Sequence, residues 1–179
     1  MRQRLCDFCP YICTRSHEPN QVVLNRRRQH VRASSIRGGP PEYSAAIAGV
    51  AACSPPTSAA AILAVFNLTV HIKNPSGLST ACVWSDATAV VSYGGATIGA
   101  GVVPWLCAGK EEEREVAAPV WGVGAGADVT LPRALQSRGA VVDVAVRMPR
   151  GNVCLSYAQV LSCSVRVGGG PSLCTSACD

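Results

Sequence analysis

Apolar and polar residues alternate along the chain most strictly between residues 63 and 73. Phe66, Leu68, Val70 and Ile72 are apolar, and the residues between them are polar. A period of two predicts a β-strand with one buried face and one face in solvent. The strand should end at Asn74-Pro75-Ser76-Gly77, because proline lacks the backbone donor that a sheet uses and glycine permits a positive φ.

Shorter segments of similar character lie on both sides of this strand. The sequence predicts further strands over Tyr43–Val50, Ala81–Tyr93, Glu113–Trp121 and Val141–Met148, and one or two within Leu155–Val167. Gly94-Gly95 predicts a two-residue hairpin turn, and Leu131–Arg138 predicts one short helix. About seven short strands separated by turn residues predict an all-β antiparallel β-sandwich.

The composition divides the 179 residues into three parts. Residues 1–41 have no apolar periodicity and are rich in arginine, which predicts a disordered basic head and linker. Residues 42–168 contain the expected strands and form the predicted sandwich domain. Residues 169–179 follow a run of glycines and are expected to form a tail that contains cysteines.

The net charge of +5 is concentrated in the head. Residues 1–39 hold eight arginines and two acidic residues, whereas residues 40–179 hold eight basic and nine acidic residues. The sandwich region therefore has no overall field that would attract nucleic acid or anionic lipid. Arg26, Arg27 and Arg28 form a candidate basic patch, either a solvated tail or a weak site for acidic headgroups, nucleic acid or nuclear import.

Ten cysteines are many for a cytosolic protein of this size, and they favour an oxidising compartment for the sandwich region. Disulfides are expected among the later cysteines, without an assigned pairing: Cys154, Cys163, Cys174 and Cys178. In the head, a tetrahedral zinc site would draw on Cys6, Cys9, Cys13 and His17. Their spacing matches no common zinc knuckle, so we expect no metal site there.

Two motifs of the alternating strand have both a structural and a functional interpretation. Asn67-Leu68-Thr69 is an N-glycosylation pattern on the solvent face, so Asn67 is either a glycan site or a polar strand residue. Asn74 and Pro75 are expected to be structural, because asparagine satisfies local backbone donors and proline fixes a turn. The alternative is a loop that binds a ligand or partner.

The sequence predicts a protein that is not an enzyme and has neither a cofactor nor a small-molecule substrate. The sandwich region has one histidine, His71, on the solvent face of its strand. A cysteine–histidine nucleophile would need a thiol within hydrogen-bond reach of His71 and a third group that orients the ring. No local signature of such a site is present, and we find no phosphate-binding glycine loop.

Three of these segments together resemble the plant late embryogenesis abundant group 2 domain, most closely its harpin-induced-like disease-resistance branch. The segments are Phe66–Val70 running into Asn74-Pro75, Val91–Gly95 leading to Ile98–Gly101, and the strand Val141–Arg147. The resemblance covers about residues 42–168. It implies a fibronectin-III-like or immunoglobulin-like sandwich without enzymatic activity, with roles in pathogen defence and in drought or salt stress.

Members of that family usually carry a cytosolic head, one transmembrane helix and a sandwich outside the plasma membrane. The resemblance thus implies the plasma membrane and a glycoprotein. The residues before Tyr43 contain no secretory signal and no run of about 20 strongly apolar residues, which favours a soluble cytosolic form. We expect association with proteins or membranes in stress and defence. The alternative is a nucleic-acid- or anionic-lipid-binding protein that acts through its Arg-rich head.

Overall fold

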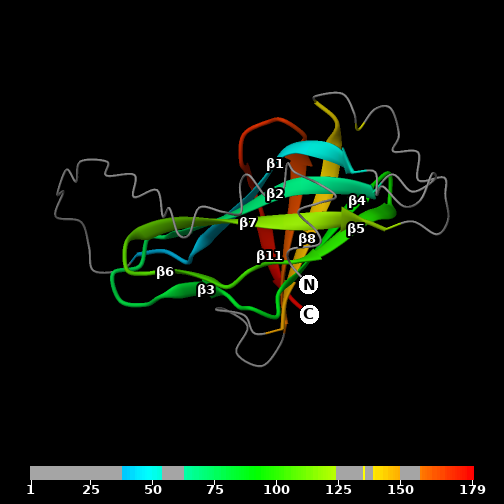
Figure 1. Cartoon of the computed structure of the whole chain (residues 1–179). Helices are drawn as coiled ribbons and strands as arrows, with labels where there is room; N and C mark the ends of the chain where they lie inside the picture. The colour runs from blue at the N-terminus through cyan, green and yellow to red at the C-terminus, as the bar shows by residue number, and fades with distance from the viewer. Residues whose placement is uncertain (1–37, 54–62, 124–134, 136–138, 150–157) are drawn as a thin grey trace.

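The computed structural model describes residues 38–53, 63–123, 135, 139–149 and 158–179. Eleven strands lie in this part of the chain (Figure 1): β1 (Glu42–Cys53), β2 (Leu63–Asn74), β3 (Ala81–Val83), β4 (Thr88–Tyr93), β5 (Ala96–Val102), β6 (Leu106–Ala108), β7 (Glu112–Gly122), β8 (Val141–Met148), β9 (Gln159–Arg166), β10 (Ser172–Leu173) and β11 (Thr175–Cys178). The head was predicted over residues 1–41, and residues 1–37 of it lie outside the described residues.

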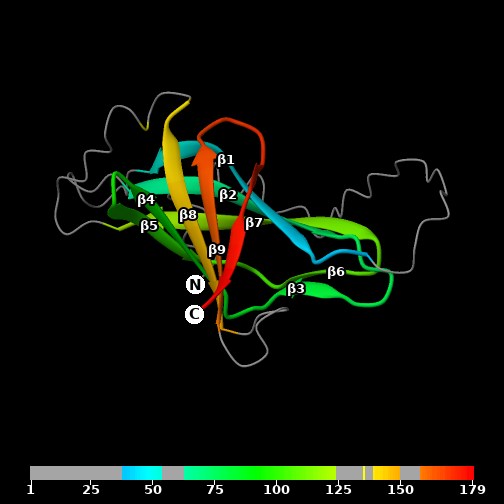
Figure 2. The same cartoon turned by 180° about the vertical axis from the view of Figure 1, so that it is seen from behind.

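The strands form a nine-stranded antiparallel sheet in the order β10-β1-β2-β7-β5-β4-β8-β9-β11 and a two-stranded sheet of β3 and β6. The large sheet curls back on itself, so that β1 and β9 come together (Figures 1 and 2). There Ile47 forms a parallel bridge with Val167, and the Gly168 N–H donates to the Ile47 carbonyl over 2.8 Å. The predicted all-β antiparallel sandwich is confirmed, with a barrel-like closure along this side.

The core is built around β2, which lies between β1 and β7. Phe66, Leu68, Val70 and Ile72 are all buried, as their alternation predicts, and they pack against apolar residues of the other strands. Removing a side chain of this kind from water contributes about 1.5–3 kcal/mol to the stability. The predicted strands over Tyr43–Val50, Glu113–Trp121 and Val141–Met148 are confirmed as well, as parts of β1, β7 and β8.

Residues 81–108 form one long hairpin that changes from the small sheet to the large one. Its tip is the predicted Gly94-Gly95 turn, where both glycines have positive φ values of 58° and 82°. The prediction of a single strand over Ala81–Tyr93 is wrong, because a turn separates β3 from β4. In that turn the Ala87 N–H donates to the Trp84 carbonyl over 3.0 Å.

The C-terminal residues add two strands that the sequence did not predict. Residues 169–179 were expected as a tail, yet β10 pairs with β1 and β11 pairs with β9. Cys174 lies between these strands, its N–H donates to the Tyr43 carbonyl over 2.9 Å, and it forms a disulfide with Cys163 of β9. The short C-terminal strands therefore join the two ends of the large sheet.

Two other expectations reach the limits of the described residues. Of the helix expected over Leu131–Arg138, only Leu135 is described, and it is buried in the core. The strand expected within Leu155–Val167 is present as β9 from Gln159 onward. In the described ranges no helix is long and apolar enough to cross a lipid bilayer.

Candidate functional site

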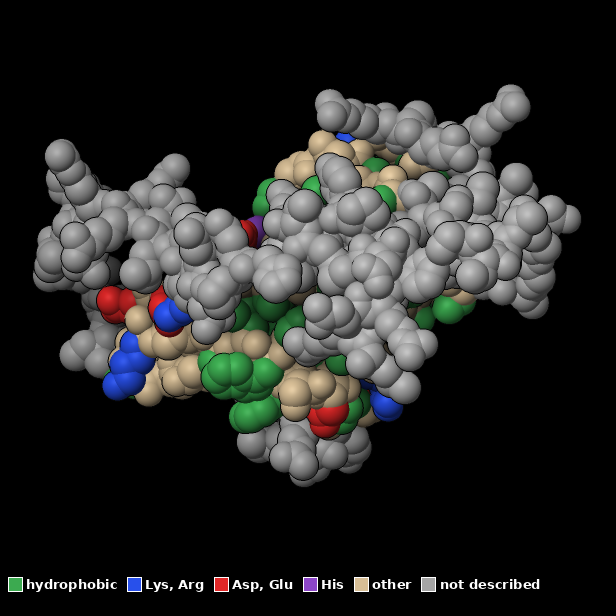
Figure 3. Space-filling model, in the orientation of Figure 1, with side chains coloured by type: hydrophobic (Ala, Val, Ile, Leu, Met, Phe, Trp, Pro, Cys, Tyr) green, Lys and Arg blue, Asp and Glu red, His purple; other side chains and the backbone are tan. Residues whose placement is uncertain are grey.

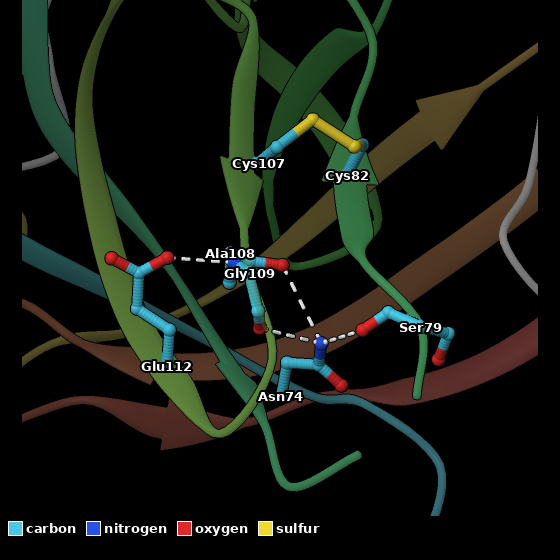
Figure 4. Close-up of a disulfide and its surroundings, with 7 residues drawn as sticks. All are labelled: Asn74, Ser79, Cys82, Cys107, Ala108, Gly109 and Glu112. Atoms are coloured by element: carbon cyan, nitrogen blue, oxygen red, sulfur yellow. Dashed lines mark hydrogen bonds between the residues drawn. A yellow bond between two sulfur atoms is a disulfide. The ribbon is translucent and has the colours of Figure 1, made fainter. Parts of the chain in front are cut away.

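Asn74 lies at the end of β2 and ties three chain segments together (Figure 4). Its Nδ2 donates to the carbonyls of Ser79 and Gly109, each over 2.7 Å, and approaches the Ala108 carbonyl at 3.4 Å. Its Oδ1 accepts the Ser76 N–H over 3.2 Å. Asn74 thus accepts from a local backbone donor, as its motif suggested, and it also fixes the connection between β6 and β7, which the motif did not indicate.

The β6–β7 connection has its own polar contacts. Glu112 accepts the Gly109 N–H over 2.7 Å and pairs with the Nε of Arg114. The Gly109 hydrogen bond is the main cause that lowers the pKa of Glu112 below 4.5; Arg114 lowers it further, and partial burial acts in the opposite direction. Glu111 has a φ of 53°, and its N–H donates to the Ser76 carbonyl over 3.1 Å. These contacts hold the turn beneath Asn74.

A disulfide joins β3 and β6 beside this cluster (Figure 4). Cys82 and Cys107 face each other in the two-stranded sheet, with their Cα atoms 4.1 Å apart. Cys163 and Cys174 form a second disulfide, one of the pairings that the sequence left open, and Cys178 is in a disulfide as well. The hydrogen bonds of Asn74 and the Cys82–Cys107 disulfide therefore cross-link the chain segments at this end of the sandwich, which we call the β3–β6 scaffold.

Two tryptophans project from this scaffold, and the sequence analysis did not single them out. Trp84 directly follows β3 and Trp105 directly precedes β6, and they are 37% and 60% exposed. Figure 3 shows hydrophobic side chains gathered on the surface in the region where Figure 1 places β3 and β6. Trp84 and Trp105 are two of the exposed large apolar side chains of the described residues, and this pair is a candidate binding surface.

Asn67 lies on the outer face of β2, as expected, and its side chain is half-buried. On one side the β1 register shifts between Ile47 and Val50, so that Ala48 and Gly49 both lie opposite Asn67. On the other side its partner is Pro119 of β7. The cross-strand neighbours of Asn67 on this face are therefore small residues.

The same outer face carries the charged and titratable residues of β2. His71 Nδ1 lies 3.1 Å from Oε2 of Glu115 on β7, and Lys73 Nζ lies 3.0 Å from Oε2 of Glu42 on β1. Five cysteines of the described part are in disulfides: Cys82, Cys107, Cys163, Cys174 and Cys178. His71 thus interacts with a carboxylate, and a thiol of these five cysteines is not available to it.

Several residues that the sequence singled out lie outside the described part of the chain. Arg26, Arg27 and Arg28 lie outside the described residues, as do Cys6, Cys9, Cys13 and His17. Within the part of the chain that the structure covers, no group of three or more His, Cys, Asp or Glu side chains is arranged to hold a metal ion.

Comparison with known proteins does not assign the chain to a family: no family model, curated protein or solved structure matches it.

Proposed function

We propose that this protein is a non-enzymatic β-sandwich module of the group 2 late embryogenesis abundant type, which serves plant stress and defence responses by associating with proteins or with the plasma membrane. The observation that carries the proposal is the role of Asn74. The Asn-Pro motif of the resemblance ends the central strand, and Asn74 uses both of its polar atoms in backbone contacts at that end. Because Asn74 stabilises the fold, its contacts support a structural module that binds partners through its surface.

The non-enzymatic part of the proposal is supported by the chemistry of the described side chains. His71 contacts Glu115 on the outer face of the large sheet. Glu112, whose pKa is lowered, is engaged by the Gly109 N–H and by Arg114. Catalytic acids and bases are usually poised near neutral pH. The Gly109 and Arg114 contacts favour the ionised form of Glu112, which supports a structural rather than a catalytic role for it.

A genetic experiment tests the physiological role. Plants that lack the gene should tolerate dehydration, salt or pathogen challenge less well than the wild type, and the wild-type chain should restore tolerance. A chain with His71→Ala should restore it equally, because a scaffold without catalysis does not need this imidazole. Normal tolerance in the disrupted plants under all three challenges would contradict the proposal.

The second candidate function is binding of nucleic acid or anionic lipid through the Arg-rich head. It is favoured by the charge distribution, since residues 1–39 hold eight arginines and two acidic residues. Binding of this kind weakens steeply as salt rises, because each neutralised phosphate releases counterions.

Changing Arg26, Arg27 and Arg28 together to serine separates the two functions. Binding to phosphatidylserine vesicles or to a DNA duplex that is strong at low salt and lost in this variant supports the head as the working part. Retention of stress tolerance by the same variant supports the scaffold.

A further inference from the structure

We propose that Trp84 and Trp105 form a binding platform for a neutral polysaccharide of β-linked pyranose sugars. This inference goes beyond the proposed function, because it assigns a ligand class to a surface at the β3–β6 end of the sandwich. Three properties of that surface carry it: the rigid support of the two indoles, the area that they expose, and the charge around them.

The backbone that carries the two indoles is held by contacts on both sides. Val83 pairs with Leu106, and this is the last pair of the β3–β6 ribbon before the two tryptophans. Beyond them the ribbon is joined again, since the Val103 N–H donates to the Ala87 carbonyl over 2.9 Å. The Cys82–Cys107 disulfide links the strands on the near side. A platform that is fixed before binding loses little conformational entropy when a ligand arrives.

The area that the two indoles expose is much smaller than a standard protein interface. With exposed fractions of 37% and 60%, the two indoles present about 240 Å² if a whole tryptophan side chain has about 250 Å². A standard protein interface buries about 800 Å² on each partner. Two indole faces instead match the size of a few sugar rings.

The charge around the platform favours a neutral ligand. In the flanking segments 78–88 and 102–109, Asp86 is the one charged residue, and it is exposed. Arg147 lies opposite Thr88 on the neighbouring strand, where it pairs with Asp179 over 3.5 Å. A surface for nucleic acid or anionic lipid would need unpaired basic residues here.

The chemistry of a β-linked pyranose fits these groups. Its substituents lie around the ring edge, so that the ring faces present C–H groups, which the negative face of an indole attracts. The hydroxyl groups at the edge need hydrogen-bond partners, and the turn between β3 and β4 supplies the Ser85 hydroxyl and the Asp86 carboxylate. Each indole also carries an N–H donor.

The test uses the full oxidised chain in native electrophoresis through gels that contain mixed-linkage β-glucan, xylan or galactomannan. We expect at least one of these neutral polysaccharides to retard the protein. Trp84→Ala with Trp105→Ala should weaken binding about tenfold or more. Tyrosine at both positions should retain most of the affinity, whereas leucine at both should bind as weakly as alanine, because leucine keeps apolar area and loses the aromatic face.

Leu173→Ala is the matched control, since Leu173 is an exposed apolar residue on β10 and should be dispensable. Circular dichroism checks that every variant remains folded. The proposal is overturned if none of the three polysaccharides retards the protein, or if the leucine variant binds like the wild type. It is also overturned if the tryptophans are needed instead for binding to phosphatidylcholine vesicles or for self-association in sedimentation experiments.

Discussion

Replacing Asn74 by alanine should destabilise the whole sandwich, although this residue lies at the end of a strand. Its side chain is 1% exposed, and it makes three hydrogen bonds of 2.7–3.2 Å to the backbone of Ser76, Ser79 and Gly109. A hydrogen bond contributes about 1 kcal/mol net, and a buried group left without a partner costs about 1–3 kcal/mol. Since Ser79 is exposed and Gly109 is only partly buried, water can solvate their carbonyls in the variant, and we expect a loss of about 3 kcal/mol in the free energy of unfolding.

The direction of the hydrogen bonds gives a sharper test than their number. Asn74→Asp retains the size of the side chain and the oxygen that accepts the Ser76 N–H. It replaces the donating amide by a carboxylate oxygen that faces the carbonyls of Ser79 and Gly109. At neutral pH we therefore expect Asn74→Asp to be at least as destabilising as Asn74→Ala.

Urea denaturation of the oxidised protein, followed by tryptophan fluorescence and circular dichroism, measures both variants. Ser76→Ala is the control, because the Ser76 hydroxyl accepts only the exposed N–H groups of Leu78 and Ser79 and the Ser79 hydroxyl. Its loss should stay below about 1 kcal/mol. A loss of less than about 1 kcal/mol for Asn74→Ala, or an Asn74→Asp variant as stable as the wild type, would refute the stabilising role of the Asn74 hydrogen bonds.

Three further predictions concern other parts of the sandwich. Since the pKa of Glu112 is lowered in the folded state, its stabilising contribution is present above pH 4.5 and is lost as the pH falls through the lower folded value. The stability difference between wild type and Glu112→Gln should therefore shrink on acidification, and a difference that grows in acid would contradict this. Changing both Cys163 and Cys174 to serine should lower the free energy of unfolding by about 3 kcal/mol and expose β10 and β11 to proteases. Protease resistance equal to that of the wild type would show that the disulfide does not hold these strands in place. Expression through a secretory pathway should yield a chain that loses mass on endoglycosidase treatment, and Asn67→Gln should abolish the shift; a wild-type chain without the shift has no glycan at Asn67.

The sequence predicted those strands whose alternation has one physical cause, the burial of a single face. β2 and β8 are of this kind, and so is the Gly94-Gly95 turn, because its positive φ values suit glycine. The sequence did not reveal the break between β3 and β4, because the alternation of buried residues continues through it. Residues 84–87 form a turn that leaves the alternation in phase, so that burial of alternate residues continues on both sides of it: Ala81, Val83, Ala87, Ala89 and Val91 are all buried. A pattern of period two carries no information about which sheet a strand joins.

The C-terminal strands could not be predicted from local pattern. The residues of β11 are all exposed, so burial leaves no alternation to detect, and its position depends on pairing with β9. The hydrogen bond from Asn74 to the Gly109 carbonyl could not be predicted from local pattern either, since Gly109 is 35 residues away along the chain. Contacts of this kind are set by the tertiary arrangement and have no signature of their own in the sequence.

The tryptophan pair is different, because the sequence did contain a signal for it. Cys82-Val83-Trp84 and Trp105-Leu106-Cys107 mirror each other at equal distances from the Gly94-Gly95 turn. The β4–β5 register shifts by one residue between Val91 and Ser92 and is restored before β3 and β6, so that Cys82 lies opposite Cys107, where the disulfide lies, and Trp84 and Trp105 both follow the Val83–Leu106 pair. The register that permits the disulfide therefore also brings the two indoles to the same point of the ribbon. A variant that shifts this register by one residue, such as deletion of Gly95, should disrupt the disulfide and the platform together, whereas Trp84→Ala should leave the disulfide intact.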